Sequence, residues 1–203
     1  MRALILVDLQ NDFMPGGALA VPGGDEVMPV ANRLMGRFEL VLASQDWHPV
    51  DHGSFAANHP GKRPGDRIEL NGLDQILWPV HCVRETSGAE FHAELDCSRI
   101  DRVFRKGTDP GIDSYSAFFD NAQRRSTGLG RFLKQRGVRQ VHVMGLATDY
   151  CVRFTALDAV RLGFETHLVV DGCRGVELQA GDVELALAEL ERAGVRRVPS
   201  EDL

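Results

Sequence analysis

Residues 141–152, VHVMGLATDYCV, constrain the fold more than any other stretch of the chain. The first half is a continuous apolar run ending at Gly145, which is typical of a strand buried on both faces of a sheet. The second half predicts a helix, because Thr148 and Asp149 are good N-caps and apolar residues then recur at helical spacing. Cys151 is therefore expected in the first turn of a helix that follows a strand directly. Unpaired N–H groups there favour a thiolate, although an isolated cysteine of this kind is more often a small core residue.

The rest of the chain alternates short apolar runs with amphipathic segments. Strands are predicted at residues 3–7, 40–44, 102–105, 140–144, 166–170 and 195–198. Helices are predicted at residues 25 to about 38, 129–135, 149–162 and about 180–192. This alternation indicates an α/β fold with three αβα layers, in which a doubly wound, mostly parallel sheet of about six strands lies between helices. We expect residues 1–203 to form a single domain.

Residues from about 49 to 102 break this regular pattern. Glycine, proline and histidine dominate the segment, and a loop of this length inside a compact domain is usually functional or disordered. Trp47, just before the segment, and Trp78, within it, favour function. We therefore expect an irregular insertion that forms a metal site or a lid.

Composition and charge exclude several classes of protein. The formal net charge is −6 and no basic stripe is present, which argues against nucleic-acid binding. The chain contains no long uncharged apolar segment that would predict a membrane span. Acidic residues come too early for a signal peptide. Without CxxC spacing, the four cysteines are expected to be reduced thiols. These features predict a cytoplasmic protein.

Five reactive side chains follow the predicted strands: Asp8, Asp46, His48, Lys106 and Cys151. In parallel sheets, ligands bind outside the carboxyl ends of the strands, so these side chains are expected on one edge. Asp8 could accept the proton of Cys151 if burial raises the pKa of its carboxyl, or it could cap a turn. Lys106 could orient Asp8 and offset negative charge, or it could be a solvated surface lysine. Together the three resemble a catalytic triad with unusual members.

Asp46 and His48 lie two residues apart, so in extended backbone their side chains point to the same side. His81 could complete a site of two histidines and one carboxylate with open positions, which suits zinc, iron(II) or manganese(II). His52 and His59 are further candidates, as ligands or as partners of the ligands.

Five motifs, in this order, closely resemble those of the nicotinamidases, which belong to the isochorismatase-like cysteine hydrolases. They are DLQNDF at 8–13, SQDWHP at 44–49, WPVHCV at 78–83, FRKG at 104–107 and GLATDYCV at 145–152. The resemblance covers essentially the whole chain. The DWH and WPxHC motifs are similar to those of the metal-containing amidase branch.

The resemblance implies roles for individual residues. Cys151 would be the nucleophile, Asp8 the base and Lys106 the third member of the triad. Asp46, His48 and His81 would bind one divalent metal ion, with zinc expected first and iron or manganese as alternatives. The Leu146–Ala147 peptide would be cis, and the N–H groups of Ala147 and Cys151 would form the oxyanion hole. Phe13, Trp78 and Tyr115 would line the substrate pocket.

By the same resemblance, the reaction would be hydrolysis of nicotinamide to nicotinate and ammonia in NAD salvage, with pyrazinamide as a further candidate substrate. Three alternatives stay open: a related hydrolase of another small amide or carbamoyl compound, a non-haem iron oxygenase, and a catalytically silent binding or redox-sensing protein that uses the thiol. The assembly state is also open, with a homo-oligomer among the options.

Overall fold

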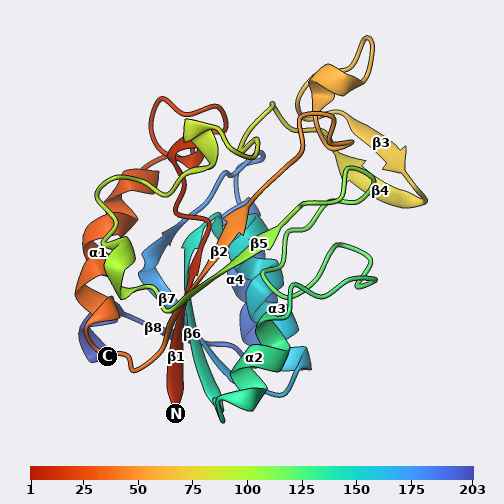
Figure 1. Cartoon of the computed structure of the whole chain (residues 1–203). Helices are drawn as coiled ribbons and strands as arrows, with labels where there is room; N and C mark the ends of the chain where they lie inside the picture. Colours follow the sequence, from red (N-terminus) through yellow and green to blue (C-terminus); the bar gives the residue numbers. More distant parts are fainter.

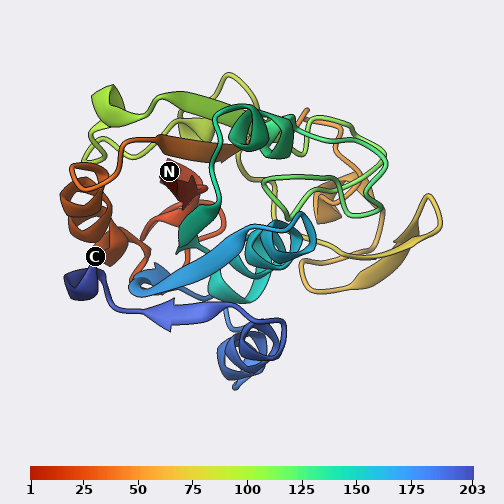
Figure 2. The ribbon, with the colours of Figure 1, turned by 90° about the horizontal axis from the view of Figure 1, so that it is seen from below.

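The computed structural model describes residues 1–203, and its core is a six-stranded parallel sheet in the order β5-β2-β1-β6-β7-β8. The strands are β1 (Arg2–Val7), β2 (Val41–Asp46), β5 (Arg102–Lys106), β6 (Gln140–Leu146), β7 (Glu165–Arg174) and β8 (Arg196–Val198). Helix α1 (Val27–Met35) lies on one face of the sheet. Helices α2 (Leu129–Gln135), α3 (Arg153–Arg161) and α4 (Asp182–Arg192) lie on the other (Figures 1 and 2). The predicted three-layer α/β fold is confirmed.

Strand β1 shows why the sheet needs cover on both sides. Residues 3–7 are all apolar and have no exposed surface. Because successive side chains point to opposite faces, such a strand is stable only when helices or loops remove both faces from water.

The strand order places a crevice between β1 and β6. From β1 the chain adds β2 and β5 on one side, and then returns to add β6, β7 and β8 on the other. The connections that leave the carboxyl ends of β1 and β6 therefore diverge to opposite sides, which is where doubly wound sheets bind ligands. Asp8 follows β1 directly, and Cys151 lies five residues beyond the end of β6.

The segment from about 49 to 102 contains one hairpin that the sequence prediction missed. Strands β3 (Arg67–Leu70) and β4 (Leu73–Ile76) pair antiparallel and project from the body of the molecule (Figure 1). Their loop is Asn71-Gly72, and both residues have positive φ angles, 50° and 82°. Asn-Gly is the strongest short sequence signal for a two-residue hairpin loop, so the signal was present.

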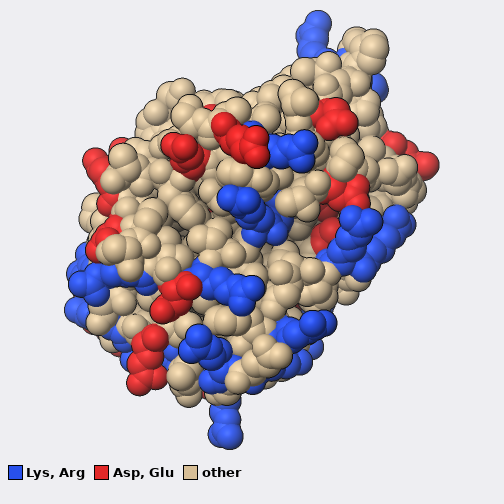
Figure 3. Space-filling view, viewed as in Figure 1, with Lys and Arg blue, Asp and Glu red and all other residues tan.

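The remaining helical elements are single turns. The 3-10 turns are η1 (Asn11–Phe13), η2 (Gly24–Glu26), η3 (Ala56–Asn58), η4 (Ser87–Ala89), η5 (Cys97–Arg99) and η7 (Ser200–Asp202). A π-helical turn, η6 (Thr148–Val152), precedes α3. Acidic and basic side chains are interspersed on the face drawn in Figure 3. None of the helices combines the length and the apolar character that crossing a membrane requires.

Candidate active site

The residues predicted as reactive come together at the carboxyl edge of the sheet. Asp8 directly follows β1 and has a φ of 52°, which is unusual for a residue other than glycine. Asp46 and Lys106 are the last residues of β2 and β5 and are paired in the sheet register. Cys151 lies in η6. All four side chains are buried.

Lys106 lies at the centre of this group. Its Nζ is 2.8 Å from Asp8 Oδ2, 2.6 Å from Asp46 Oδ1 and 3.3 Å from Cys151 Sγ. It also donates a hydrogen bond of 3.0 Å to the Ser114 carbonyl. Burial disfavours the charged ammonium, but the charges of Asp46 and Asp8 outweigh burial and hold the pKa of Lys106 well above its usual range. Lys106 is therefore a buried cation shared by two carboxylates.

Sharing one cation leaves the two carboxylates unequal. Burial opposes the charge of Asp46, but Lys106 and His48 overcome this and keep the pKa of Asp46 far below its usual range. For Asp8, burial dominates over the attraction of Lys106 and raises the pKa of this carboxyl to about 6. Ser44 Oγ donates to Asp8 Oδ1 at 2.7 Å, and the Lys106 ammonium lies 2.8 Å from Asp8 Oδ2. A carboxylate oxygen of Asp8 also lies within 4.8 Å of Cys151 Sγ, so Asp8 can take a proton from the thiol.

The protonation state of Cys151 differs from the thiolate that the sequence predicts. Burial raises the pKa of Cys151 well above its usual value, and the charge of Lys106 only partly opposes this. The resting group is therefore a thiol and not the expected thiolate, because burial and the charges of Asp8 and Asp46 outweigh the charge of Lys106. The caps are also different: neither Thr148 nor Asp149 caps the helix, and Asp149 instead accepts hydrogen bonds from the N–H groups of Val176 and Glu177.

Ala147 lies beside Cys151 on the same cavity. The Leu146–Ala147 peptide is cis, as predicted. The N–H groups of Tyr150 and Val152 both donate to the Ala147 carbonyl at 3.1 Å. This carbonyl is therefore engaged by the turn that carries Cys151.

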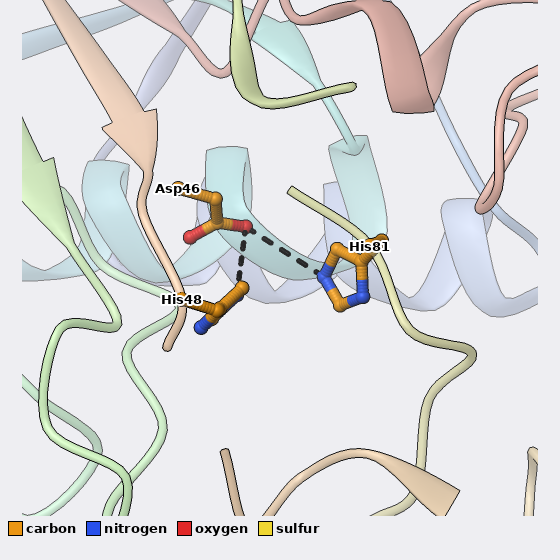
Figure 4. Close-up of side chains that lie close together, drawn as sticks. All are labelled: Asp46, His48 and His81. Atoms are coloured by element: carbon orange, nitrogen blue, oxygen red, sulfur yellow. Dashed lines mark ion pairs between the residues drawn. The ribbon is translucent and has the colours of Figure 1, made fainter. Parts of the chain in front are cut away.

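Asp46, His48 and His81 form a compact cluster of metal-ligating side chains (Figure 4). Asp46 Oδ2 is 3.6 Å from His48 Nε2 and 4.0 Å from His81 Nε2. The Nδ1 atoms of the two rings lie 2.9 Å from the Gly107 carbonyl and 2.8 Å from the Pro79 carbonyl. Carbonyls only accept, so each Nδ1 carries the proton and each Nε2 presents its lone pair. This donor set fits a divalent transition metal.

Gly107 is required beside this cluster. It has a φ of 64°, and a Cβ built on it would lie 2.3 Å from the His48 ring. Any larger residue would displace His48, so glycine at the end of the FRKG motif has a steric reason.

His52 and His59 have separate positions. His52 Nδ1 contacts Ser54 Oγ at 2.7 Å, and His52 lies close enough to His48 and Asp113 to form a second group of donors. His59 Nε2 contacts the Gly53 carbonyl at 2.7 Å and belongs to none of the three groups of metal-ligating side chains.

One cavity joins the two sets of residues. It is lined by Cys151 and Ala147 on one side and by the Asp46, His48 and His81 cluster on another. The predicted pocket residues Phe13, Trp78 and Tyr115 also line it, as do Leu19, Asp113, Tyr150 and Val176, which the sequence prediction missed. Tyr150 directly precedes the cysteine, and its ring packs edge-on against Trp78 with centroids 4.9 Å apart. Aromatic side chains and a thiol thus line the same cavity.

Comparison with known proteins agrees with this geometry. The model of the isochorismatase domain matches residues 2–202. The nicotinamidase of Escherichia coli is 53% identical over 95% of this chain and 92% of its own length. The nicotinamidase and pyrazinamidase structure from Acinetobacter baumanii superimposes with a TM-score of 0.96 at 49% identity, covering 99% of this chain and 97% of that one.

A zinc-bound structure is also similar. The pyrazinamidase of Pyrococcus horikoshii in complex with zinc superimposes with a TM-score of 0.80 at 39% identity, covering 98% of both chains. The fold, the grouped side chains and these similarities lead to one assignment: the chain belongs to the isochorismatase family of hydrolases, in its nicotinamidase branch.

Proposed function

We propose that this protein hydrolyses nicotinamide to nicotinate and ammonia in NAD salvage. The observation that carries the proposal is a buried thiol beside a carboxylate of raised pKa, in the cavity that also contains the Asp46, His48 and His81 cluster. The names of the similar relatives, nicotinamidase and pyrazinamidase, support an aromatic carboxamide as the substrate.

In the first half of the reaction, Cys151 attacks the amide carbonyl. The thiol transfers its proton to the Asp8 carboxylate, an oxygen of which lies within 4.8 Å of Cys151 Sγ, as sulfur bonds to the carbonyl carbon. The N–H groups of Ala147 and Cys151 would stabilise the developing oxyanion. Asp8 then passes its proton to the leaving nitrogen, the C–N bond breaks, and ammonia and a thioester result. Lys106 keeps its charge throughout and offsets the negative charge that forms at sulfur.

In the second half, water hydrolyses the thioester. Asp8 accepts a proton from the water as its oxygen adds to the carbonyl. The C–S bond then breaks, and Asp8 returns the proton to the Cys151 sulfur. The product leaves as the carboxylic acid, which loses its remaining proton to water and becomes nicotinate, and Asp8 and Cys151 are back in their starting protonation states.

Asp46, His48 and His81 would hold one divalent metal ion, for which we propose zinc. The ion would supply a Lewis-acid anchor for the ring nitrogen. The substrate ring would be held by the aromatic side chains of the cavity, Phe13, Trp78 and Tyr115. Its amide carbonyl would then stay next to Cys151. Positioning of this kind is important for rate, because a misplacement of about 1 Å can cost on the order of a hundredfold.

The test is ammonia release from nicotinamide by metal-replete protein, with mass spectrometry of the trapped thioester. Cys151→Ala should abolish turnover and leave fold and metal content unchanged. Single Ser replacements of the other free cysteines, Cys82, Cys97 and Cys173, should remain active. Activity of Cys151→Ala within tenfold of the parent would refute the assignment of the nucleophile.

A second experiment tests the metal site. Exhaustive chelation should remove about one equivalent of metal and lower activity, with recovery on adding zinc. His48→Ala should lose the metal, whereas His92→Ala, at a histidine that belongs to none of the groups of metal-ligating side chains, should retain it. Full metal occupancy in His48→Ala by elemental analysis would contradict the ligand assignment.

A further inference from the structure

Gln75 is a buried amide on a projecting hairpin. It lies in β4, and only 2% of its surface is exposed, whereas its neighbour Asp74 is solvent-exposed. Figure 1 shows the β3–β4 hairpin extending away from the sheet. Gln75 therefore turns inward from an element that otherwise lies at the surface.

The Gln75 amide contacts two residues of the cavity wall. Its Nε2 lies 3.0 Å from Asp113 Oδ2, 3.1 Å from Tyr115 Oη and 2.7 Å from the Ile76 carbonyl. A carboxylate only accepts hydrogen bonds, so the amide must present nitrogen to Asp113, and this fixes its orientation. Gln75 does not line the cavity itself. It can act on a substrate only through the residues that it holds.

Tyr115 connects Gln75 to Trp78, one of the aromatic residues that line the cavity. Its hydroxyl also accepts a hydrogen bond of 3.1 Å from Trp78 Nε1. The rings of Trp78 and Tyr115 pack edge-on, with centroids 6.5 Å apart and planes at 90°. Gln75, Tyr115 and Trp78 therefore form one chain of hydrogen bonds that sets the orientation of the indole.

Asp113 connects Gln75 to the metal-ligand side of the cavity. It is buried, its Oδ1 accepts the Ser114 N–H, and a carboxylate oxygen lies within 4.8 Å of ring nitrogens of His48 and His52. Gln75 thus contacts both the aromatic side of the cavity, through Tyr115, and the side next to the histidines, through Asp113.

We propose that Gln75 is a positioning and specificity-determining residue for ring carboxamides. By holding Tyr115 and Asp113 to the β3–β4 hairpin, it limits the outward movement of the cavity wall, so that a single six-membered ring fits and a larger ring does not. This inference rests on the proposed function. Loss of the Gln75 amide leaves the Tyr115 hydroxyl and the Asp113 carboxylate each with one donor fewer, so this part of the cavity wall becomes free to move outward.

The test compares Gln75→Leu and Gln75→Met, which keep the volume but cannot donate, with the parent holoenzyme. The substrates are nicotinamide and the bicyclic quinoline-3-carboxamide. We expect kcat/KM for nicotinamide to fall about tenfold, with most of the change in KM, while the bicyclic amide loses less or gains. The selectivity ratio should therefore fall at least fivefold.

The matched control is Arg67→Gln, which removes the exposed ion pair between Arg67 and Asp74 on the same hairpin. It should leave kinetics and selectivity unchanged. Tyr115→Phe combined with Gln75→Leu should be non-additive, because both changes break the same chain of hydrogen bonds. Metal content and the rate of Cys151 alkylation by iodoacetamide should match the parent in every Gln75 variant.

Binding provides a readout that does not depend on turnover. In holo protein carrying Cys151→Ala, adding Gln75→Leu should weaken nicotinate binding about tenfold by calorimetry. An unchanged selectivity ratio, or equal losses for both amides, would overturn the role of Gln75. Failure of the parent to hydrolyse nicotinamide would instead overturn the proposed function, and the calorimetry would still test Gln75.

Discussion

At the scale of single residues, the raised pKa of Asp8 makes a prediction about pH. Burial raises this pKa to about 6, and the proposed base acts only when ionised. Below pH 6, kcat/KM for nicotinamide should therefore fall about tenfold per pH unit, and above it a plateau should follow. The profile of the parent enzyme measures this directly. A plateau continuing to pH 4.5 would contradict Asp8 as the base.

Ser44 provides a sharper version of this test. Its hydroxyl donates to Asp8 Oδ1 and so favours the ionised form. Ser44→Ala should move the acidic limb of the kcat/KM profile to higher pH and change the plateau by less than about tenfold. Ser98→Ala, which alters an exposed hydroxyl near Asp96, is the control and should leave the profile in place. If the acidic limb of the kcat/KM profile does not move in Ser44→Ala, the group that titrates in this limb is not Asp8.

The sequence alone predicted which residues lie together in the active site, but it did not predict their protonation states. Asp8, Lys106 and Cys151 were expected together because they follow parallel strands, and strand ends are readable from apolar periodicity. Their protonation depends on burial and on the sharing of Lys106 between Asp8 and Asp46, which is set by packing across the sheet. Gln75 carried no readable signal, because its role exists only through contacts with residues about forty positions away.

At the scale of elements, the close approach of β6 to β1 makes the next prediction. Gly145 has a φ of 125°, and a Cβ there would lie 2.2 Å from the Val7 carbonyl oxygen. Gly145→Ala should therefore lower the free energy of unfolding by at least about 2 kcal/mol, because neither backbone can move away. Urea unfolding of the two proteins measures the difference.

Gly36→Ala is the matched control for this strand variant. Gly36 has a φ of −73°, and a Cβ there would meet nothing closer than 3.7 Å. Its stability should stay within about 1 kcal/mol of the parent. Equal stability of Gly145→Ala and the parent would show that β1 and β6 separate more easily than their packing indicates.

The elements also show where periodicity was informative and where it was not. The six strands and four helices of the body were predicted because burial imposes a regular apolar pattern on them. The β3–β4 hairpin was missed because β3 alternates only half-buried with exposed residues, and little apolar periodicity results. The π-helical turn that carries Cys151 also has no pattern of its own, since it is a local departure from an otherwise helical sequence.

At the scale of the whole molecule, stability should depend on pH through a histidine far from the active site. His142 is buried in β6, where it packs against Phe38 and His167 with ring centroids 4.9 and 4.7 Å away. Burial, together with the charges of His167 and Arg2, lowers the pKa of His142 to about 4, although Glu165 opposes this. The ordinary histidine pKa is about 6.5, so the unfolded chain binds this proton more readily than the folded protein.

The sign of the effect follows from that difference. Above pH 6.5 both states leave His142 neutral, and its contribution to stability is complete. Between pH 6.5 and 4 only the unfolded chain takes up the proton, so the free energy of unfolding should fall by up to about 1.4 kcal/mol per pH unit from this group. Urea unfolding between pH 7.5 and 4 should show a smaller slope in His142→Leu than in the parent. His92→Gln should keep the parent's slope, and an identical slope in His142→Leu would assign the acid sensitivity to other groups.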